Sequence, residues 1–173
     1  MPGASRQERA WVRGAQAGRV SDMEALFRAH WSSCLRTAFL IVHDAAAAED
    51  IAQESFLAAL RRLDRFDARR PLAPWLHRIV VNRAIDWTRS RQLRAEAELG
   101  ELHGYEAARE LSDETLSALA RLTPEHRAVI VLRHLLGYSP GEIARLLGIP
   151  RGTVNSRLRR GLDTLKEAVV SET

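Results

Sequence analysis

The sequence has 173 residues, and its 46% hydrophobic content is sufficient for packed cores in one domain or in two small ones. No apolar run approaches the ~20 residues of a membrane span, and the first residues lack the apolar stretch of a signal peptide. We therefore expect a cytoplasmic protein without membrane insertion. The net charge is only +4, from 26 basic and 22 acidic residues, but it is spread unevenly along the chain.

The residue types that usually carry catalysis or bind metals show no pattern in this chain. Cys34 is the only cysteine and sits in an apolar helical pattern, which predicts a buried thiol. The six histidines are scattered without the spacing of a zinc site. No Ser-His-Asp signature and no phosphate-binding glycine loop is present. We expect a binding protein with no cofactor, no metal and no enzymatic activity.

The first 60 residues are predicted to form three helices. The first runs from Ser5 to Gly18, and a capping box at residues 21–24 opens a long second helix. Apolar or aromatic residues recur there every three or four positions, which predicts core packing of Leu26, Phe27, His30, Trp31, Leu35, Phe39 and Val42.

The third helix is predicted at residues 45–60, capped by Asp44. Its expected inward residues are Ile51, Phe56, Leu57 and Leu60, whereas its first half carries Asp44, Glu49, Asp50 and Glu54 without a basic residue. Acidic side chains near a helix N-terminus are favoured by the helix dipole. The same residues could instead form a docking surface for a basic partner, and the sequence pattern alone leaves both readings open.

The charge reverses between Arg61 and Arg94, with ten arginines against three aspartates. Two prolines mark residues 67–74 as a loop, and a helix is predicted at residues 74–92. Its expected buried side is Trp75, Leu76, Ile79, Val80 and Ile85, and its exposed side is Asn82, Arg83, Asp86, Arg89 and Ser90. A basic helix with interleaved aromatics suits single-stranded or distorted nucleic acid. A merely solvated helix is the alternative.

An acidic segment, residues 95–111, is predicted to be a flexible linker, because five glutamates oppose one arginine and two glycines interrupt any helix. A second domain follows at residues 112–170. Helices are predicted to begin at Ser112 and Thr123, and the latter to end at Gly137. Together they would supply a core of Leu116, Leu119, Leu122, Val129, Ile130, Leu132, Leu135 and Leu136.

The last segment has the pattern of a helix-turn-helix. Ser139 and Glu142 form a capping box around Pro140, and Gly148 ends that short helix. A second helix begins near Arg151, with inward residues predicted at Val154, Leu158, Leu162 and Leu165. Two short helices joined by a glycine turn are typical of this motif.

The second helix of the motif has an outer face without acids. Four arginines fall between Pro150 and Gly161. The side opposite the apolar stripe carries Thr153, Ser156 and Arg160, whereas Asn155 and Arg157 flank the stripe itself. Such side chains hydrogen-bond phosphates and base edges in a major groove. The alternative is a solvated face of a bundle helix, but the cap, the turn and the positive face together favour DNA binding.

Two stretches resemble bacterial sigma factors, especially the extracytoplasmic-function (ECF) group. Residues 123–166 resemble region four in the runs LTPEHRAVIVLRH, SPGEIARLLGI and GTVNSRLRRG, and residues 23–93 resemble region two in AEDIAQESF and PWLHRIVVNRAID. The resemblance implies an all-α chain of two small domains, region two at 5–94 and region four at 112–170. Three departures stand out, namely His77, Pro150 and Gly161, the last expected to weaken an exposed helix by up to ~1 kcal/mol.

The resemblance also implies roles for named residues. The acidic helix would dock on the beta-prime clamp helices of core RNA polymerase through Glu49, Asp50, Gln53 and Glu54. The minus-ten element would be bound and melted by Arg69, Arg70, Asn82, Arg83, Asp86 and Arg89. The minus-thirty-five element would be read by Arg151, Thr153, Asn155, Ser156, Arg157 and Arg160. Further expected partners are the beta flap of the polymerase and an anti-sigma factor.

Three other classes of protein were weighed against this reading. A helix-turn-helix regulator that works without polymerase accounts for the C-terminal motif but not for residues 23–93. An enzyme acting on nucleic acid would need a metal cluster or a nucleophile–base pair. An anti-sigma or adaptor protein would not carry two DNA-reading surfaces. The sequence therefore favours a transcription initiation factor, and it leaves open whether the two domains touch in the free protein.

Overall fold

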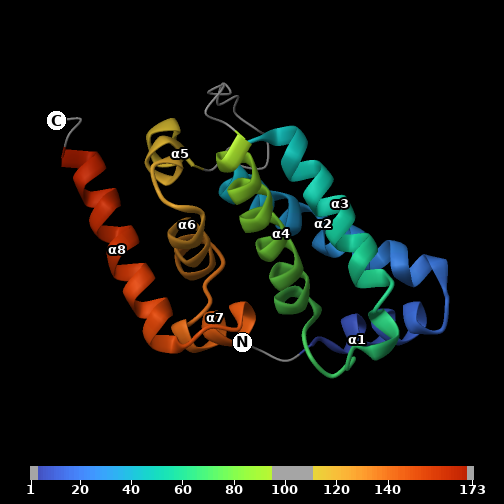
Figure 1. Cartoon of the computed structure of the whole chain (residues 1–173). Coiled ribbons are helices and arrows are strands. Elements are labelled where there is room, and N and C mark those ends of the chain that lie inside the picture. Colours follow the sequence, from blue (N-terminus) through green and yellow to red (C-terminus); the bar gives the residue numbers. More distant parts are fainter. Residues whose placement is uncertain (1–3, 95–110, 171–173) are drawn as a thin grey trace.

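The computed structural model describes residues 4–94 and 111–170 (Figure 1). Within these ranges the chain forms eight α-helices and no β-strand, which confirms the all-α prediction. The helices are α1 (Arg6–Gln16), α2 (Val20–Val42), α3 (Ala45–Leu60), α4 (Leu72–Arg94), α5 (Asp113–Ala120), α6 (Pro124–Ile130), α7 (Pro140–Leu147) and α8 (Arg151–Val170). None of the described helices is long and apolar enough to cross a membrane.

Most helix starts lie where local sequence chemistry placed them. Asp44 accepts a hydrogen bond from the Ala47 N–H at 2.9 Å, at the start of α3. At α7 the Ser139 hydroxyl accepts from the Glu142 N–H, and the Glu142 carboxylate accepts from the Ser139 N–H, so the predicted capping box is confirmed. Gly148 ends α7 in the left-handed conformation, at φ 67°, as predicted.

The start of α2 differs from the prediction. The helix begins at Val20 with Arg19 as its N-cap, and no side chain caps it, so the capping box expected at residues 21–24 is wrong. Gly18 turns the chain at φ 82°, and the Arg19 guanidinium binds the Asp22 carboxylate at 2.6 Å. This earlier turn draws Ser21 into the helix, where its hydroxyl cannot cap the end.

Helices α1–α4 form one module, in which α2 packs against α1, α3 and α4. Its core contains Leu26, Phe39, Leu40, Ile41, Leu76, Val80 and Val81. Two residues expected inside lie outside, because Leu57 is 53% exposed and Phe27 is 40% exposed. Phe27 rests on the surface of the module, where its ring stacks on Trp31 at 4.8 Å and meets the edge of Phe56 at 5.1 Å.

Helices α5–α8 form a second module around the helix-turn-helix. Buried residues here include Leu116, Leu119, Val129, Ile130, Ile143 and Val154. Leu162, expected inside, is 37% exposed. Each four-residue step advances 400° around a helix, so Leu162 lies 80° away from Val154. Gly161, seven residues after Val154, returns to within 20° of it and is buried instead.

Gly161 allows close packing of α8 on α6. A Cβ atom there would lie 3.0 Å from Cγ1 of Ile130, so the expectation of an exposed, merely weakening glycine is wrong. Overpacking a core typically costs about 1–3 kcal/mol, and we expect Gly161→Leu to lower the free energy of unfolding by about that amount in urea titrations. Gly152→Leu is the matched control, because a Cβ at Gly152 meets nothing within 4 Å. Equal effects of the two variants would contradict the packing role.

The two modules contact each other directly. Helix α4 packs against α6 and α7, and α2 packs against α6, so that the two bundles lie side by side (Figure 1). The predicted linker falls almost entirely on residues 95–110, outside the described residues. The contact answers the question that the sequence left open, since the modules are held together in this structure.

Candidate nucleic-acid and partner interfaces

The acidic residues of α3 lie together on one exposed face. Glu49, Asp50, Gln53 and Glu54 are all exposed, and Leu57 follows three residues after Glu54 on the same side of the helix. We refer to these five residues as the α3 face. Leu57 was missed because its three-residue step to Leu60 resembles core spacing. The signal that could have found it is its seven-residue distance from Asp50, which places both on one side.

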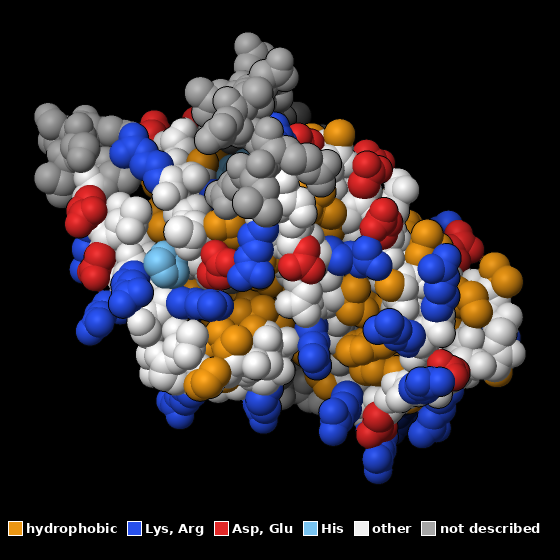
Figure 2. All heavy atoms as spheres, in the orientation of Figure 1, with side chains coloured by type: hydrophobic (Ala, Val, Ile, Leu, Met, Phe, Trp, Pro, Cys, Tyr) orange, Lys and Arg blue, Asp and Glu red, His pale blue; other side chains and the backbone are white. Residues whose placement is uncertain are grey.

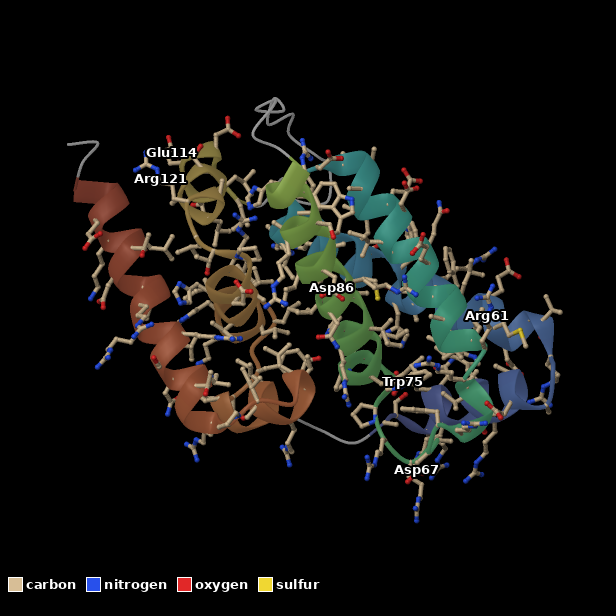
Figure 3. The ribbon with its side chains drawn as sticks, viewed as in Figure 1. Arg61, Asp67, Trp75, Asp86, Glu114 and Arg121 are labelled. Atoms are coloured by element: carbon tan, nitrogen blue, oxygen red, sulfur yellow. The ribbon has the colours of Figure 1, made fainter. Side chains whose placement is uncertain are left out.

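The loop before α4 carries the two predicted arginines, Arg69 and Arg70, and both are exposed. Arg69 binds the Asp67 carboxylate through two parallel hydrogen bonds of 2.9 Å. These bonds, together with the Arg69 backbone N–H, lower the pKa of Asp67 to about 2. Asp67, at the tip of the loop in Figure 3, therefore stays charged and holds the Arg69 side chain in place.

The outer side of α4 brings together three of its four predicted residues. Asn82, Asp86 and Arg89, spaced by four and three positions, are exposed on one side of the helix, and Figure 3 places Asp86 midway along it. Arg83 points elsewhere, because its guanidinium binds Glu54 of the α3 face at 2.6 Å. A predicted DNA contact, Arg83, is thus paired with a predicted docking residue, Glu54. Exposed ion pairs contribute little to stability, so this pair can break when either residue meets a partner.

A basic pocket of about 830 Å³ lies between the loop before α4 and helix α7. Its walls include Arg70, Trp75 and Arg78 from the first module, and Tyr138, Glu142 and Arg145 from the second. The rings of Trp75 and Phe66 lie 4.8 Å apart at this site. Figure 2 shows arginine side chains gathered along the lower edge of the molecule, where Figure 1 places the loop and α7.

Helix α8 presents the residues predicted to read duplex DNA. Arg151, Asn155 and Arg160 are exposed, whereas Thr153, Ser156 and Arg157 are half-buried. Burial and, to a smaller extent, the charges of Arg157 and Arg160 lower the pKa of His126 on α6. Of the six predicted residues, Arg151, Asn155 and Arg160 are therefore the most accessible to a ligand.

The described residues offer little for metal or thiol chemistry. In residues 4–94 and 111–170 no group of three or more His, Cys, Asp or Glu side chains is arranged to hold a metal ion. Cys34 is buried, as predicted, and burial raises the pKa of its thiol to about 12. The surfaces that remain are the acidic α3 face, the arginine-bearing loop before α4 with the outer side of that helix, and the basic face of α8.

Comparison with known proteins identifies the family. The model of sigma-70 region 2 matches residues 26–94, and the model of sigma-70 region 4 matches residues 112–165. The chain is 36% identical over 164 residues to the ECF RNA polymerase sigma factor SigL of Mycobacterium tuberculosis, covering 90% of this chain and 93% of that protein. The chain belongs to the ECF sigma factors. It is a sigma factor, which directs RNA polymerase in transcription initiation.

Other relatives agree with this family. RNA polymerase sigma-E factor of Streptomyces coelicolor is 32% identical over 158 residues, with 89% of each chain covered. The solved structure of CnrH in complex with the cytosolic domain of CnrY superposes with a TM-score of 0.73, at 28% identity, over 96% of this chain and 99% of that one. RpoE of Bartonella quintana, solved with the anti-sigma factor NepR, shares the fold at TM-score 0.74 and 23% identity.

Proposed function

We propose that the three surfaces of this sigma factor divide the work of initiation. The α3 face docks on the beta-prime clamp helices of core RNA polymerase. The loop arginines and the outer side of α4 bind the minus-ten element, and α8 reads the minus-thirty-five element as duplex. The observation that carries the proposal is the separation of an arginine-bearing loop in the first module and a basic helix face in the second from an acidic face on α3.

Strand capture at the minus-ten element follows from the chemistry of the loop and α4. Unstacking a base costs a few kcal/mol. A surface that binds the unstacked base therefore promotes melting of the duplex without hydrolysis of a nucleoside triphosphate. Arg69 and Arg70 supply positive charge for the phosphates, and Asn82 supplies an amide for base edges. Trp75, half-buried at the start of α4, lines the adjacent pocket. The protein itself therefore acts by binding, without catalysing a reaction.

Binding at two points gives the promoter specificity that one module lacks. A single small DNA-reading module buries only about 600–1,000 Å² of protein surface. Core polymerase, contacted through the clamp helices and the beta flap, holds both modules on one DNA and raises the effective concentration of the second contact. The chain works in the cytoplasm. An anti-sigma factor is its further partner, as in the solved complex of the Bartonella protein with NepR.

Run-off transcription with purified core polymerase and a promoter library tests the proposal. We expect transcripts only when the protein is present, and only from promoters that share defined minus-ten and minus-thirty-five sequences. A polymerase-independent regulator, the rival function, would instead bind its site equally well without core polymerase in a salt-matched mobility-shift assay. The absence of any dependent transcript would contradict the proposed function.

A further inference from the structure

A pocket with a positive lining lies where the two modules meet. Its volume of about 830 Å³ is within the range of pockets that hold small ligands, which occur preferentially between domains. One wall comes from the loop before α4 and the start of that helix, and the other comes from α7 and from Tyr138, which precedes it. A small molecule in this pocket therefore contacts both modules at once.

Positive charge dominates the lining of this pocket. Five arginines line it against two carboxylates, those of Asp67 and Glu142. The Asp67 carboxylate is bound by Arg69, and the Glu142 carboxylate accepts hydrogen bonds of 2.8 Å from the backbone N–H and the hydroxyl of Ser139. Both carboxylates are thus already held by neighbouring groups. The arginines that line the pocket are Arg62, Arg65, Arg70, Arg78 and Arg145.

Three of these arginines stand apart from the carboxylates of the described part of the chain. Within residues 4–94 and 111–170, Arg62, Arg78 and Arg145 have no carboxylate at ion-pair distance, and all three are exposed. Like charges gathered in a cleft focus the electrostatic field and raise the local concentration of anions. The planar guanidinium of arginine binds phosphate through two parallel hydrogen bonds. The lining therefore suits a small molecule that carries several phosphate groups.

An aromatic wall stands beside these arginines. Phe66 and Trp75 both line the pocket, with ring centroids 4.8 Å apart, and Figure 3 shows Trp75 near the start of α4. Pro71 and Pro74 line the same wall, and their fixed φ angles restrict the backbone that carries the rings. Aromatic side chains stack on any nucleobase, because every base has a π-face. Positive charge and an aromatic wall in one pocket fit the two parts of a nucleotide.

We propose that this pocket binds a free nucleoside triphosphate, with its phosphates on Arg78 of the first module and Arg145 of the second and its base against Trp75. The proposal goes beyond the function proposed above, because Arg62, Arg78 and Arg145 carry none of the assigned DNA or polymerase contacts. A ligand that binds only the folded chain stabilises it by mass action. The site belongs to the sigma factor itself and needs neither core polymerase nor a promoter.

Isothermal titration calorimetry of the full chain with ATP tests this site, in EDTA and at one fixed salt concentration, because salt screens exposed charges. Arg78→Ala and Arg145→Ala each remove one guanidinium, one from each module, and Trp75→Leu removes the ring but keeps an apolar side chain. Arg159→Ala is the matched control, since Arg159 is an exposed arginine of α8 that does not line the pocket. Inorganic triphosphate and adenosine are titrated as the two halves of the ligand, and circular dichroism checks the helix content of each variant.

We expect each arginine variant to raise the Kd for ATP by roughly 3- to 10-fold, the usual effect of losing a hydrogen bond to a charged group. Trp75→Leu should raise it by roughly 5-fold or more, since base stacking is lost. Arg159→Ala should bind ATP as the unaltered protein does, and triphosphate and adenosine should each bind at least about 10-fold more weakly than ATP.

Three results would overturn the site. The first is no binding of ATP at millimolar concentration. The second is a loss in Arg159→Ala equal to that in the pocket variants, and the third is equal binding of triphosphate and ATP. Either of these last two reduces the effect to general attraction of a polyanion by a basic surface. If Trp75→Leu loses helix content, the arginine variants and the adenosine titration decide without it.

Discussion

Arg127→Ala is expected to lower the free energy of unfolding by about 3–5 kcal/mol, because each buried carbonyl that it leaves unsatisfied costs about 1–3 kcal/mol. The Arg127 side chain is buried at the start of the second module. Its guanidinium donates to the carbonyl oxygens of Leu119, Ala120 and Leu122 at 2.7–2.9 Å, and to that of Ile41 in the first module. Burial lowers its pKa to about 10, so the group remains charged at neutral pH.

The size of this effect follows from where the carbonyls lie. The last four carbonyls of an α-helix have no partner within the helix, and a cation near that end is favoured by the helix dipole. Ile41 belongs to the last turn of α2, and Leu119 and Ala120 belong to the last turn of α5. A single guanidinium therefore caps two helices from different modules. Its removal leaves several buried acceptors without a donor.

Urea unfolding followed by circular dichroism measures the change. Arg133→Ala is the matched control, because Arg133 is exposed and its guanidinium makes one 3.2 Å hydrogen bond to the carbonyl of Tyr138. We expect the control to lose less than about 1 kcal/mol, as exposed positions usually do. Arg127→Lys should fall between the two, since an ammonium lacks the planar fork that reaches several carbonyls. A loss for Arg127→Ala no larger than that of the control would contradict the capping role.

The helix ends could largely be predicted from the sequence, because they depend on neighbours a few residues away. Asp44 caps α3, as the sequence indicated. Ser139 and Glu142 form the predicted capping box at the start of α7, and Gly148 ends that helix as predicted. The all-α fold and the two-module organisation followed from the same local signals. The predicted start of α2 was wrong because the chain turns earlier, at Gly18, and Ser21 lies inside the helix.

Helical spacing alone could not tell whether an apolar residue at the edge of the apolar side of a helix is buried or exposed. Leu57 precedes Leu60 by three residues and Leu162 follows Leu158 by four, which are helical intervals, yet Leu57 and Leu162 are both exposed. The opposite error occurred at Gly161, because a glycine gives no hydrophobic signal although its side of α8 is buried. These errors matter for function, since Leu57 turned out to complete the α3 face.

The contact between the modules could not be predicted, because its partners lie far apart in the sequence. Arg127 and Ile41 are separated by 86 positions, and His77 and Tyr138 by 61. In the sequence, Arg127 stood out only as part of the run that resembles region four. His77 stood out only as a departure from the pattern of region two. Exposure of most of the proposed site residues followed from helical periodicity, although Thr153, Ser156 and Arg157 are half-buried. The pairing of Arg83 with Glu54 and of Arg89 with Glu125 required the three-dimensional structure.

The double variant Asp50→Ala, Gln53→Ala is expected to weaken binding to core RNA polymerase by roughly 10- to 100-fold, or about 1.4–2.8 kcal/mol. In the proposed function these two side chains flank Leu57 on the α3 face and meet a basic partner surface. Removing them leaves partner donors desolvated without an acceptor, which usually costs more than the lost contact itself. Both residues are exposed, so the fold should keep its stability.

Co-purification and fluorescence titration with core polymerase measure this loss, and urea unfolding checks the fold. The matched control is Asp163→Ala with Gln7→Ala, which removes the same two chemical groups from exposed positions on α8 and α1. Asp50 and Gln53 share one face with Leu57, so a docking role predicts that Leu57→Ala also weakens binding. If acids near the start of α3 serve only the helix dipole, the Leu57 variant and the control will both match the unaltered protein. Binding that is lost in the first two variants and kept in the control therefore separates docking from local helix stabilisation, the two readings that sequence alone left open.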